Sequence, residues 1–223
     1  AIHQLADTLE NFHVTPKYLI RYENVLKCRA VLDSAEQAAC SFIDKRRDGI
    51  DVLEAALARG ELQHRPIHGD PKINNVMIDE TSGKAIGLID LDTVKPGLIH
   101  YDIGDCIRSC CNAAGEETTD LASVGFDLTL CEAMLEGYLK VARSFLSAWD
   151  LHYLPDCIRL IPLELGLRFL TDHLEGNVYF KTDRPSHNLQ RAAVQFKLVQ
   201  DIENQMPALQ RLIQRLSDRP VNE

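Results

Sequence analysis

The sequence predicts a mostly helical α+β fold into which one small β-hairpin is inserted. Apolar residues recur at helical spacing through most of the chain, most clearly over residues 128–145 and 189–202. Two short apolar segments, 67–78 and 85–91, instead flank the turn-rich residues 80–84, which is typical of strand, turn and strand. Hydrophobic residues make up 45% and charged residues 26% of the chain, which is enough for a packed core.

The first sixty residues are expected to form helices that lead into the hairpin. Ser34 is a candidate N-cap, which Glu36 or Gln37 could support. Gly49 marks a break between two helical stretches. This region therefore predicts short helices and no extended sheet.

The C-terminal half is also predicted to be helical. Residues 158–174 are mostly apolar and predict a buried pair of helices, with Pro162 as a helix start or a kink. The apolar stripe over 189–202 continues beyond Pro207. We expect these helices to build the largest part of the core.

Charge and composition exclude several classes of protein. The formal net charge is −9, so we expect neither nucleic acid nor an anionic membrane as the main partner. No apolar run approaches the roughly 18–20 residues of a membrane span, and the first residues lack the pattern of a signal peptide. Seven cysteines without a CxxC pair disfavour a zinc site and a secreted disulfide framework. A cytoplasmic protein is the expectation.

The motifs HGDPKINN and IDLD hold the side chains that phosphoryl transfer requires. The transition state of that reaction is loose, so a protein mainly positions groups and neutralises charge. Asp70 can hold an acceptor hydroxyl and take its proton, while Asn75 and Asp90 can hold magnesium against the phosphates. Lys72 can reach the transferring phosphate as a point charge.

The acidic residues of these motifs predict a divalent cation. In an extended run, Asp90 and Asp92 would point to one face about 7 Å apart, with Leu91 pointing into the core. At an effective dielectric near 20, two like charges about 5 Å apart repel by roughly 3 kcal/mol, and Asp70 adds a third charge. Oxygen ligands favour magnesium over zinc. The alternative for Asp92 is to cap the turn at Thr93.

The two motifs resemble those of the aminoglycoside phosphotransferase and choline kinase superfamily, whose catalytic loop is HxDxxxxN. The resemblance implies the C-terminal catalytic lobe of a protein-kinase-like fold, with ATP and Mg²⁺. It implies Asp70 as catalytic base, Asn75 and Asp90 as magnesium ligands, and Asp92 as an auxiliary group. Asp102 in YDIGD resembles the structural aspartate that braces the catalytic loop.

The same resemblance implies that His68 supports the catalytic loop. Longer segments, RFLTDHLEGNVYFK among them, are similar to the N-acetylhexosamine 1-kinase family. That similarity implies phosphorylation of the anomeric hydroxyl of an N-acetylated sugar, with Arg168 and Tyr179 in contact with the sugar. On the residues alone, Arg168 could instead pair with Asp172 one turn later, and Tyr179 could be a core aromatic residue beside Phe180.

The resemblance predicts a single phosphotransferase lobe over residues 1–223. Its expected parts are a helical lead-in over 1–60, a catalytic loop and metal hairpin over 61–112, and a helical substrate-binding part over 113–223. Enzymes of this kind also need a β-rich N-terminal lobe that covers the nucleotide. The residues before the catalytic loop read as helical and no glycine precedes Gly49. We therefore expect this lobe to be missing, and the chain alone to have little or no kinase activity.

Two other functions stay open. A choline, ethanolamine or homoserine kinase would fit the motifs, but a cationic acceptor favours an aromatic cage, and aromatic residues make up only 6% of the chain. A degenerate, non-catalytic binding module would fit the missing lobe, but it leaves Asp70, Asn75 and Asp90 unexplained. A protein kinase is the weakest candidate, because no APE segment follows the metal motif. The expected partners are a nucleotide, a small sugar-like substrate and the missing lobe.

Overall fold

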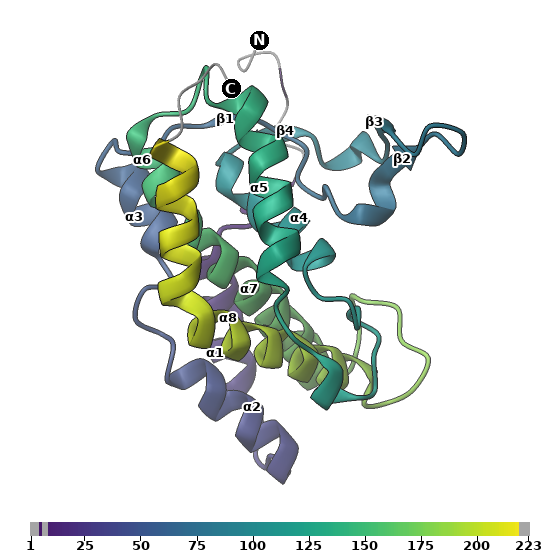
Figure 1. Cartoon of the computed structure of the whole chain (residues 1–223). Helices are drawn as coiled ribbons and strands as arrows, with labels where there is room; N and C mark the ends of the chain where they lie inside the picture. Colours follow the sequence, from purple (N-terminus) through teal and green to yellow (C-terminus); the bar gives the residue numbers. More distant parts are fainter. Residues whose placement is uncertain (1–4, 6–8, 219–223) are drawn as a thin grey trace.

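The computed structural model describes residue 5 and residues 9–218, and it has the mostly helical α+β fold that the sequence predicts (Figure 1). The helices are α1 (Thr15–Lys27), α2 (Ser34–Asp44), α3 (Val52–Ala58), α4 (Ile99–Cys110), α5 (Leu128–Ala142), α6 (Ala148–His152), α7 (Leu154–Leu174) and α8 (His187–Asp218). The strands are β1 (Arg65–Ile67), β2 (Val76–Ile78), β3 (Ala85–Leu88) and β4 (Lys95–Gly97). No helix in the described part of the chain is long and apolar enough to cross a membrane.

Helix α7 lies at the centre of the fold and packs against α8, α4 and α1. Its buried side chains surround the whole helix, as in helices that are enclosed by protein. Gly104 of α4 allows the closest approach, because a Cβ there would lie 2.4 Å from Ile161 Cγ1 and 2.8 Å from the carbonyl oxygen of Cys157. This contact fixes α4, which carries Asp102, on the core.

Two details of the predicted helices are wrong. The N-cap of α2 is Asp33 rather than Ser34: its carboxylate accepts a hydrogen bond from Glu36 N at 2.8 Å, and Glu36 Oε2 accepts one from Asp33 N. The spacing that forms this capping box starts one residue earlier than predicted. The predicted helix pair is one helix, because α7 continues through Pro162 within the buried core.

The predicted β-hairpin is present, and a second strand pair was not predicted. Strands β2 and β3 are antiparallel, with Val76 opposite Leu88, and they project from the helical body (Figure 1). Strand β1 pairs with β4, which places Ile67 opposite Lys95. Gly97 permits that pairing, because a Cβ would lie 2.4 Å from Ile67 Cδ1. The pair joins the start of the catalytic loop to the residues that follow the metal motif.

The extended geometry predicted for the IDLD motif is wrong. Asp90 has a left-handed backbone with φ of 64°, and residues Leu91–Thr93 form a 3₁₀ turn. Aspartate is one of the few non-glycine residues that adopt this conformation readily. Alternation between two faces therefore ends before Asp90, and Leu91 is 60% exposed instead of lying in the core.

Candidate active site

The candidate catalytic loop, residues 68–75, begins where β1 ends, and two neighbouring elements hold its first residues. Asp102, near the start of α4, accepts hydrogen bonds from His68 N at 2.7 Å and Gly69 N at 2.8 Å. Burial raises the pKa of the Asp102 carboxyl above its usual value, and the two N–H groups offset part of that effect. On the other side, Thr93 Oγ1 donates to the carbonyl oxygen of His68 at 2.7 Å.

Gly69 is required where the loop passes the 3₁₀ turn. Its φ is 87°, and a Cβ at this position would lie 2.7 Å from the carbonyl oxygen of Thr93. A larger residue would therefore meet both backbone strain and a clash with a neighbouring backbone. The close approach places the residues after Gly69 beside the metal motif.

The carboxylate of Asp70 is oriented by two side chains of its own loop. Lys72 Nζ lies 2.5 Å from Asp70 Oδ2, and Asn75 Nδ2 donates to Oδ2 at 3.3 Å and to the carbonyl oxygen of Asp70 at 2.8 Å. Burial lowers the pKa of Lys72, but Asp70 more than offsets this, so the pKa is raised and the amine stays charged. Among the described residues both side-chain contacts fall on Oδ2, so Oδ1 can accept a hydroxyl proton.

His68 connects the two motifs through both of its ring nitrogens. Its Nε2 donates to the carbonyl oxygen of Ile89 at 3.0 Å, and its Nδ1 accepts from Asp70 N at 3.3 Å. The N–H of Ile89 donates to the carbonyl oxygen of Asn75 at 3.0 Å. These contacts hold Asp90 next to the catalytic loop, where its charge contributes to the raised pKa of Lys72.

The structure thus brings together Asp70, Lys72, Asn75 and Asp90. Asp92 lies further along in the exposed 3₁₀ turn, and within the described residues its side chain makes no hydrogen bond or ion pair with these groups. No cluster of three or more His, Cys, Asp or Glu side chains in the described part could hold a metal ion by itself.

The donor set nevertheless fits a magnesium ion. Magnesium in phosphoryl-transfer sites takes one or two protein oxygens and completes its shell with phosphate and water oxygens. Asn75 donates its amide nitrogen to Asp70, so its amide oxygen faces away from that carboxylate, and the Asp90 carboxylate is exposed. These two oxygens would hold the ion.

A pocket of about 290 Å³ is lined by both predicted sugar contacts, Arg168 and Tyr179, and by no residue of the 68–75 loop. The Arg168 guanidinium lies 5.2 Å from the ring centroid of Phe12 and 5.0 Å from that of Tyr18. It pairs with Glu164 at 3.9 Å, so the predicted alternative partner, Asp172, is wrong.

Asp172 instead orders the loop that carries Tyr179. Its carboxylate accepts hydrogen bonds from the backbone N–H groups of Val178, Tyr179 and Phe180. Tyr179 is 65% exposed, so the alternative of a core aromatic residue is wrong, while Phe180 packs against Phe169. The loop therefore presents Tyr179 at the rim of the pocket.

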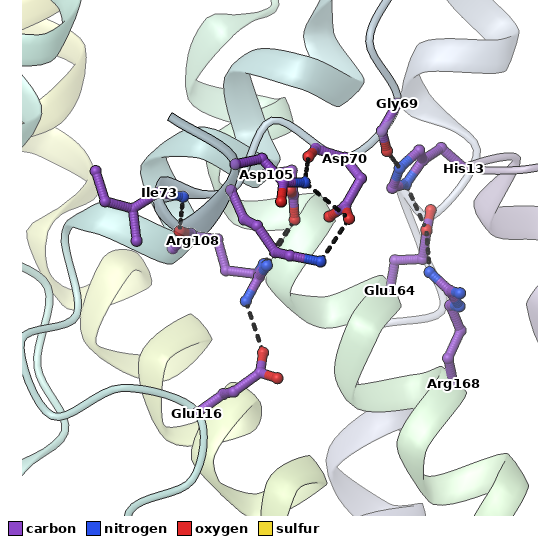
Figure 2. A network of polar contacts seen from close by, with 12 residues as sticks. His13, Gly69, Asp70, Ile73, Asp105, Arg108, Glu116, Glu164 and Arg168 are labelled. Atoms are coloured by element: carbon purple, nitrogen blue, oxygen red, sulfur yellow. Dashed lines mark hydrogen bonds and ion pairs between the residues drawn. The ribbon is translucent and has the colours of Figure 1, made fainter. Parts of the chain in front are cut away.

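Sequence reasoning missed the groups that connect this pocket to the catalytic loop. His13 contacts both Glu164 of α7 and the carbonyl oxygen of Gly69 (Figure 2). Thr15 Oγ1 donates to Glu164 Oε2 at 2.8 Å. His13 and Glu164 are 151 residues apart in the chain. No local pattern in the sequence indicates that contact.

Comparison with known families agrees with the geometry of the catalytic loop. Residues 1–141, more than half of the chain, match the family model of the phosphotransferase enzyme family. The matched range includes the catalytic loop, the IDLD motif and Asp102, whereas Arg168 and Tyr179 lie outside it. A match of this extent, over the residues that surround Asp70, shows that the chain belongs to the phosphotransferase enzyme family.

Proposed function

We propose that this chain is the catalytic lobe of a kinase that transfers the γ-phosphoryl group of ATP to a hydroxyl of a small molecule. One observation carries the proposal: an accessible carboxylate, Asp70, is oriented by Lys72 and Asn75 beside a second carboxylate, Asp90. Membership of the phosphotransferase enzyme family supports it.

Each residue of the site has a separate role in the reaction. Asp70 holds the acceptor hydroxyl and takes its proton as the hydroxyl oxygen forms its bond to the γ-phosphorus. The bond between that phosphorus and the bridging oxygen breaks, and ADP leaves in line. Lys72 neutralises charge on the transferring group. Magnesium, held by Asn75 and Asp90, would supply the charge neutralisation on the phosphates.

We propose a sugar as the acceptor, with the anomeric hydroxyl of an N-acetylhexosamine first. Arg168 and Tyr179 line one pocket, which supplies a guanidinium and a phenol for polar groups of a sugar. A choline-like cation is disfavoured there, because the rings of Phe12 and Tyr18 already face the Arg168 guanidinium, which would repel it.

We also propose that a nucleotide-binding lobe outside the described residues covers the β2–β3 hairpin. Apolar side chains of this hairpin and the turn after it are between 46% and 64% exposed. They are Met77, Ile78, Ile86, Leu88, Ile89 and Leu91. Exposed apolar side chains in this number, close in sequence to the 68–75 loop, suit a partner that closes over them. On this proposal the chain alone has little or no kinase activity.

An acceptor screen tests the proposed function. The 223-residue chain, and a longer protein in which a nucleotide-binding lobe precedes it, are incubated with ATP, Mg²⁺ and a panel of N-acetylhexosamines, hexoses and choline. Phosphorus NMR should detect a sugar 1-phosphate with the longer protein only. Asp70→Asn should lower kcat by about 10²–10⁴-fold, because a positioned base contributes that much.

The matched control is Asp48→Asn, at an exposed carboxylate outside the two motifs. It should leave kcat unchanged. Turnover that survives Asp70→Asn removes Asp70 from its role, and a longer protein that binds ATP without phosphorylating any acceptor indicates a binding module instead.

A further inference from the structure

Both ring nitrogens of His13 point at hydrogen-bond acceptors. Nδ1 lies 2.9 Å from Glu164 Oε1, and Nε2 lies 2.8 Å from the carbonyl oxygen of Gly69 (Figure 2). The His13 side chain is almost fully buried, so water does not replace either partner. Its backbone has φ of 63°, which non-glycine residues seldom adopt, so surrounding contacts must hold it.

These two contacts specify the charge of the ring. A carboxylate and a carbonyl oxygen only accept hydrogen bonds, and a neutral imidazole has only one N–H to donate. Both contacts therefore form only when His13 is an imidazolium. The second oxygen of Glu164 accepts from Thr15 Oγ1, so the carboxylate is fixed in place.

The surrounding charges favour the imidazolium on balance. Burial lowers the pKa of His13, but the Glu164 carboxylate more than offsets it, and the pKa is raised above the usual value. Arg168 acts against the imidazolium, and Asp105 of α4 acts in its favour. From the same helix, Asp102 also faces His13, and the ring of Tyr101 stacks on it with centroids 5.5 Å apart.

The Gly69 contact reaches the catalytic base directly. The carbonyl of Gly69 and the N–H of Asp70 belong to the same peptide group, so His13 sets the plane of that peptide. Asp102 holds the other side of Gly69 through its N–H at 2.8 Å. Glu164, on the far side of His13, also pairs with Arg168 in the pocket.

We propose that His13, as an imidazolium, is a positioning residue that fixes the Gly69–Asp70 peptide and connects it to the Glu164–Arg168 pair of the substrate pocket. Its relevance to catalysis rests on the proposed role of Asp70. Its charge state and its hold on the loop stand independently of that role.

Histidine NMR on the 223-residue chain tests the charge. With ¹⁵N-labelled histidine, both ring nitrogens of His13 should carry protons at pH 7, and the titration midpoint should lie above about 6.5, the ordinary value. Glu164→Gln removes the charge that favours the imidazolium and should lower the midpoint. The control His64→Gln, at an exposed histidine, should not change it. If the His13 ring of the wild-type chain is neutral at pH 7, this measurement alone overturns the proposal.

The hold on the loop has its own readout. The amide signal of Asp70 should shift with the same midpoint as His13, because deprotonation releases one end of the shared peptide. That pH-dependent shift should vanish in His13→Gln and persist in His64→Gln. If the chemical shift of the Asp70 amide does not change as His13 titrates, His13 does not position this peptide.

The sign of the pH effect follows from the raised pKa. The stabilisation from His13 is complete below about pH 6.5 and is lost as the pH rises through the higher pKa of the folded state. The urea midpoint of the wild type should therefore fall towards that of His13→Gln with rising pH. A gap between them that stays constant from pH 6 to pH 10 would contradict the assignment.

Activity gives the last readout. In a longer protein that phosphorylates an acceptor, His13→Gln should lower kcat by about 10²-fold and leave the KM for ATP unchanged, because a shifted base misplaces the reacting atoms. An unchanged kcat counts against the positioning role. A protein that phosphorylates nothing refutes the proposed function, while the NMR titrations still decide the proposal about His13.

Discussion

Two histidine rings lie beside the backbone of Asp70, and their nitrogens meet different kinds of partner. One nitrogen of His68 faces the carbonyl oxygen of Ile89 and the other accepts from the N–H of Asp70. His13 faces two acceptors, which suits an imidazolium. At the scale of single residues, each ring nitrogen must donate or accept a hydrogen bond according to its partner. Both rings contact the backbone next to Asp70.

Asp102 offers a mutational test at the same scale. Asp102→Asn leaves one acceptor oxygen for the N–H groups of His68 and Gly69 and turns an NH₂ group towards the other. An unsatisfied buried donor costs about 1–3 kcal/mol, so the free energy of unfolding should fall by about that amount. Hydrogen exchange at the amides of His68 and Gly69 should speed up, which mass spectrometry can measure.

Asp48→Asn serves as the control for Asp102→Asn, because Asp48 is exposed. It should change neither the unfolding free energy nor exchange in the loop. If Asp102→Asn leaves the exchange of both amides at the wild-type rate, the bracing of the loop does not depend on this carboxylate.

At the scale of elements, the contact between α4 and α7 sets the position of the loop. Gly104→Ala would place a methyl group 2.4 Å from Ile161 Cγ1 and 2.8 Å from the backbone oxygen of Cys157. Alanine favours a helix by about 1 kcal/mol over glycine, but overpacking of this kind costs about 1–3 kcal/mol or more where backbone must move. We expect net destabilisation, measured by urea unfolding.

Gly137 of α5 provides the matched control, because a Cβ there meets nothing within 4 Å. Gly137→Ala should stabilise the chain by about 0.5–1 kcal/mol through helix propensity. If Gly104→Ala and Gly137→Ala change the free energy of unfolding equally, α4 and α7 are not in close contact at Gly104.

The sequence predicted those elements that are encoded locally. Helical spacing identified α5 and α8, and the turn-rich residues identified the β2–β3 hairpin, whereas Pro162 made α7 look like two helices. Strand β4 has only three residues and pairs with β1 across the hairpin, so no local pattern could show it. The turn at Asp90 depends on its left-handed backbone, which an apolar segment ending in IDLD does not indicate.

In the candidate site, too, the sequence predicted the residues that lie in local motifs and missed those that tertiary packing brings together. Asp70, Lys72, Asn75 and Asp90 lie within two short motifs, so their proximity follows from a hairpin between them. His13, by contrast, reaches Glu164 and Gly69 only through packing of α7 against the start of the chain. Residues brought together by tertiary packing carry no signature in one sequence.

At the scale of the whole molecule, the helices form one body and the β2–β3 hairpin projects from it (Figure 1). The core is built by α7, α8 and their neighbours, and the hairpin contributes exposed apolar side chains instead of core. With a net charge of −9, a nucleotide would need local positive charge to offset the overall field, and Lys72 supplies one such charge beside Asp70. The magnesium ion that Asn75 and Asp90 are proposed to hold would supply part of this positive charge.

The most direct test of this account replaces magnesium with Mn²⁺, whose unpaired electrons broaden nearby NMR signals. The 223-residue chain is titrated with Mn²⁺ and ATP, and amide signals are followed, including the side-chain NH₂ of Asn75. We predict that signals of Asn75 and Asp90 broaden first, and that Asp90→Asn weakens the effect while Asp48→Asn does not. Broadening that begins elsewhere and spares both residues would contradict a shared cation site at Asn75 and Asp90.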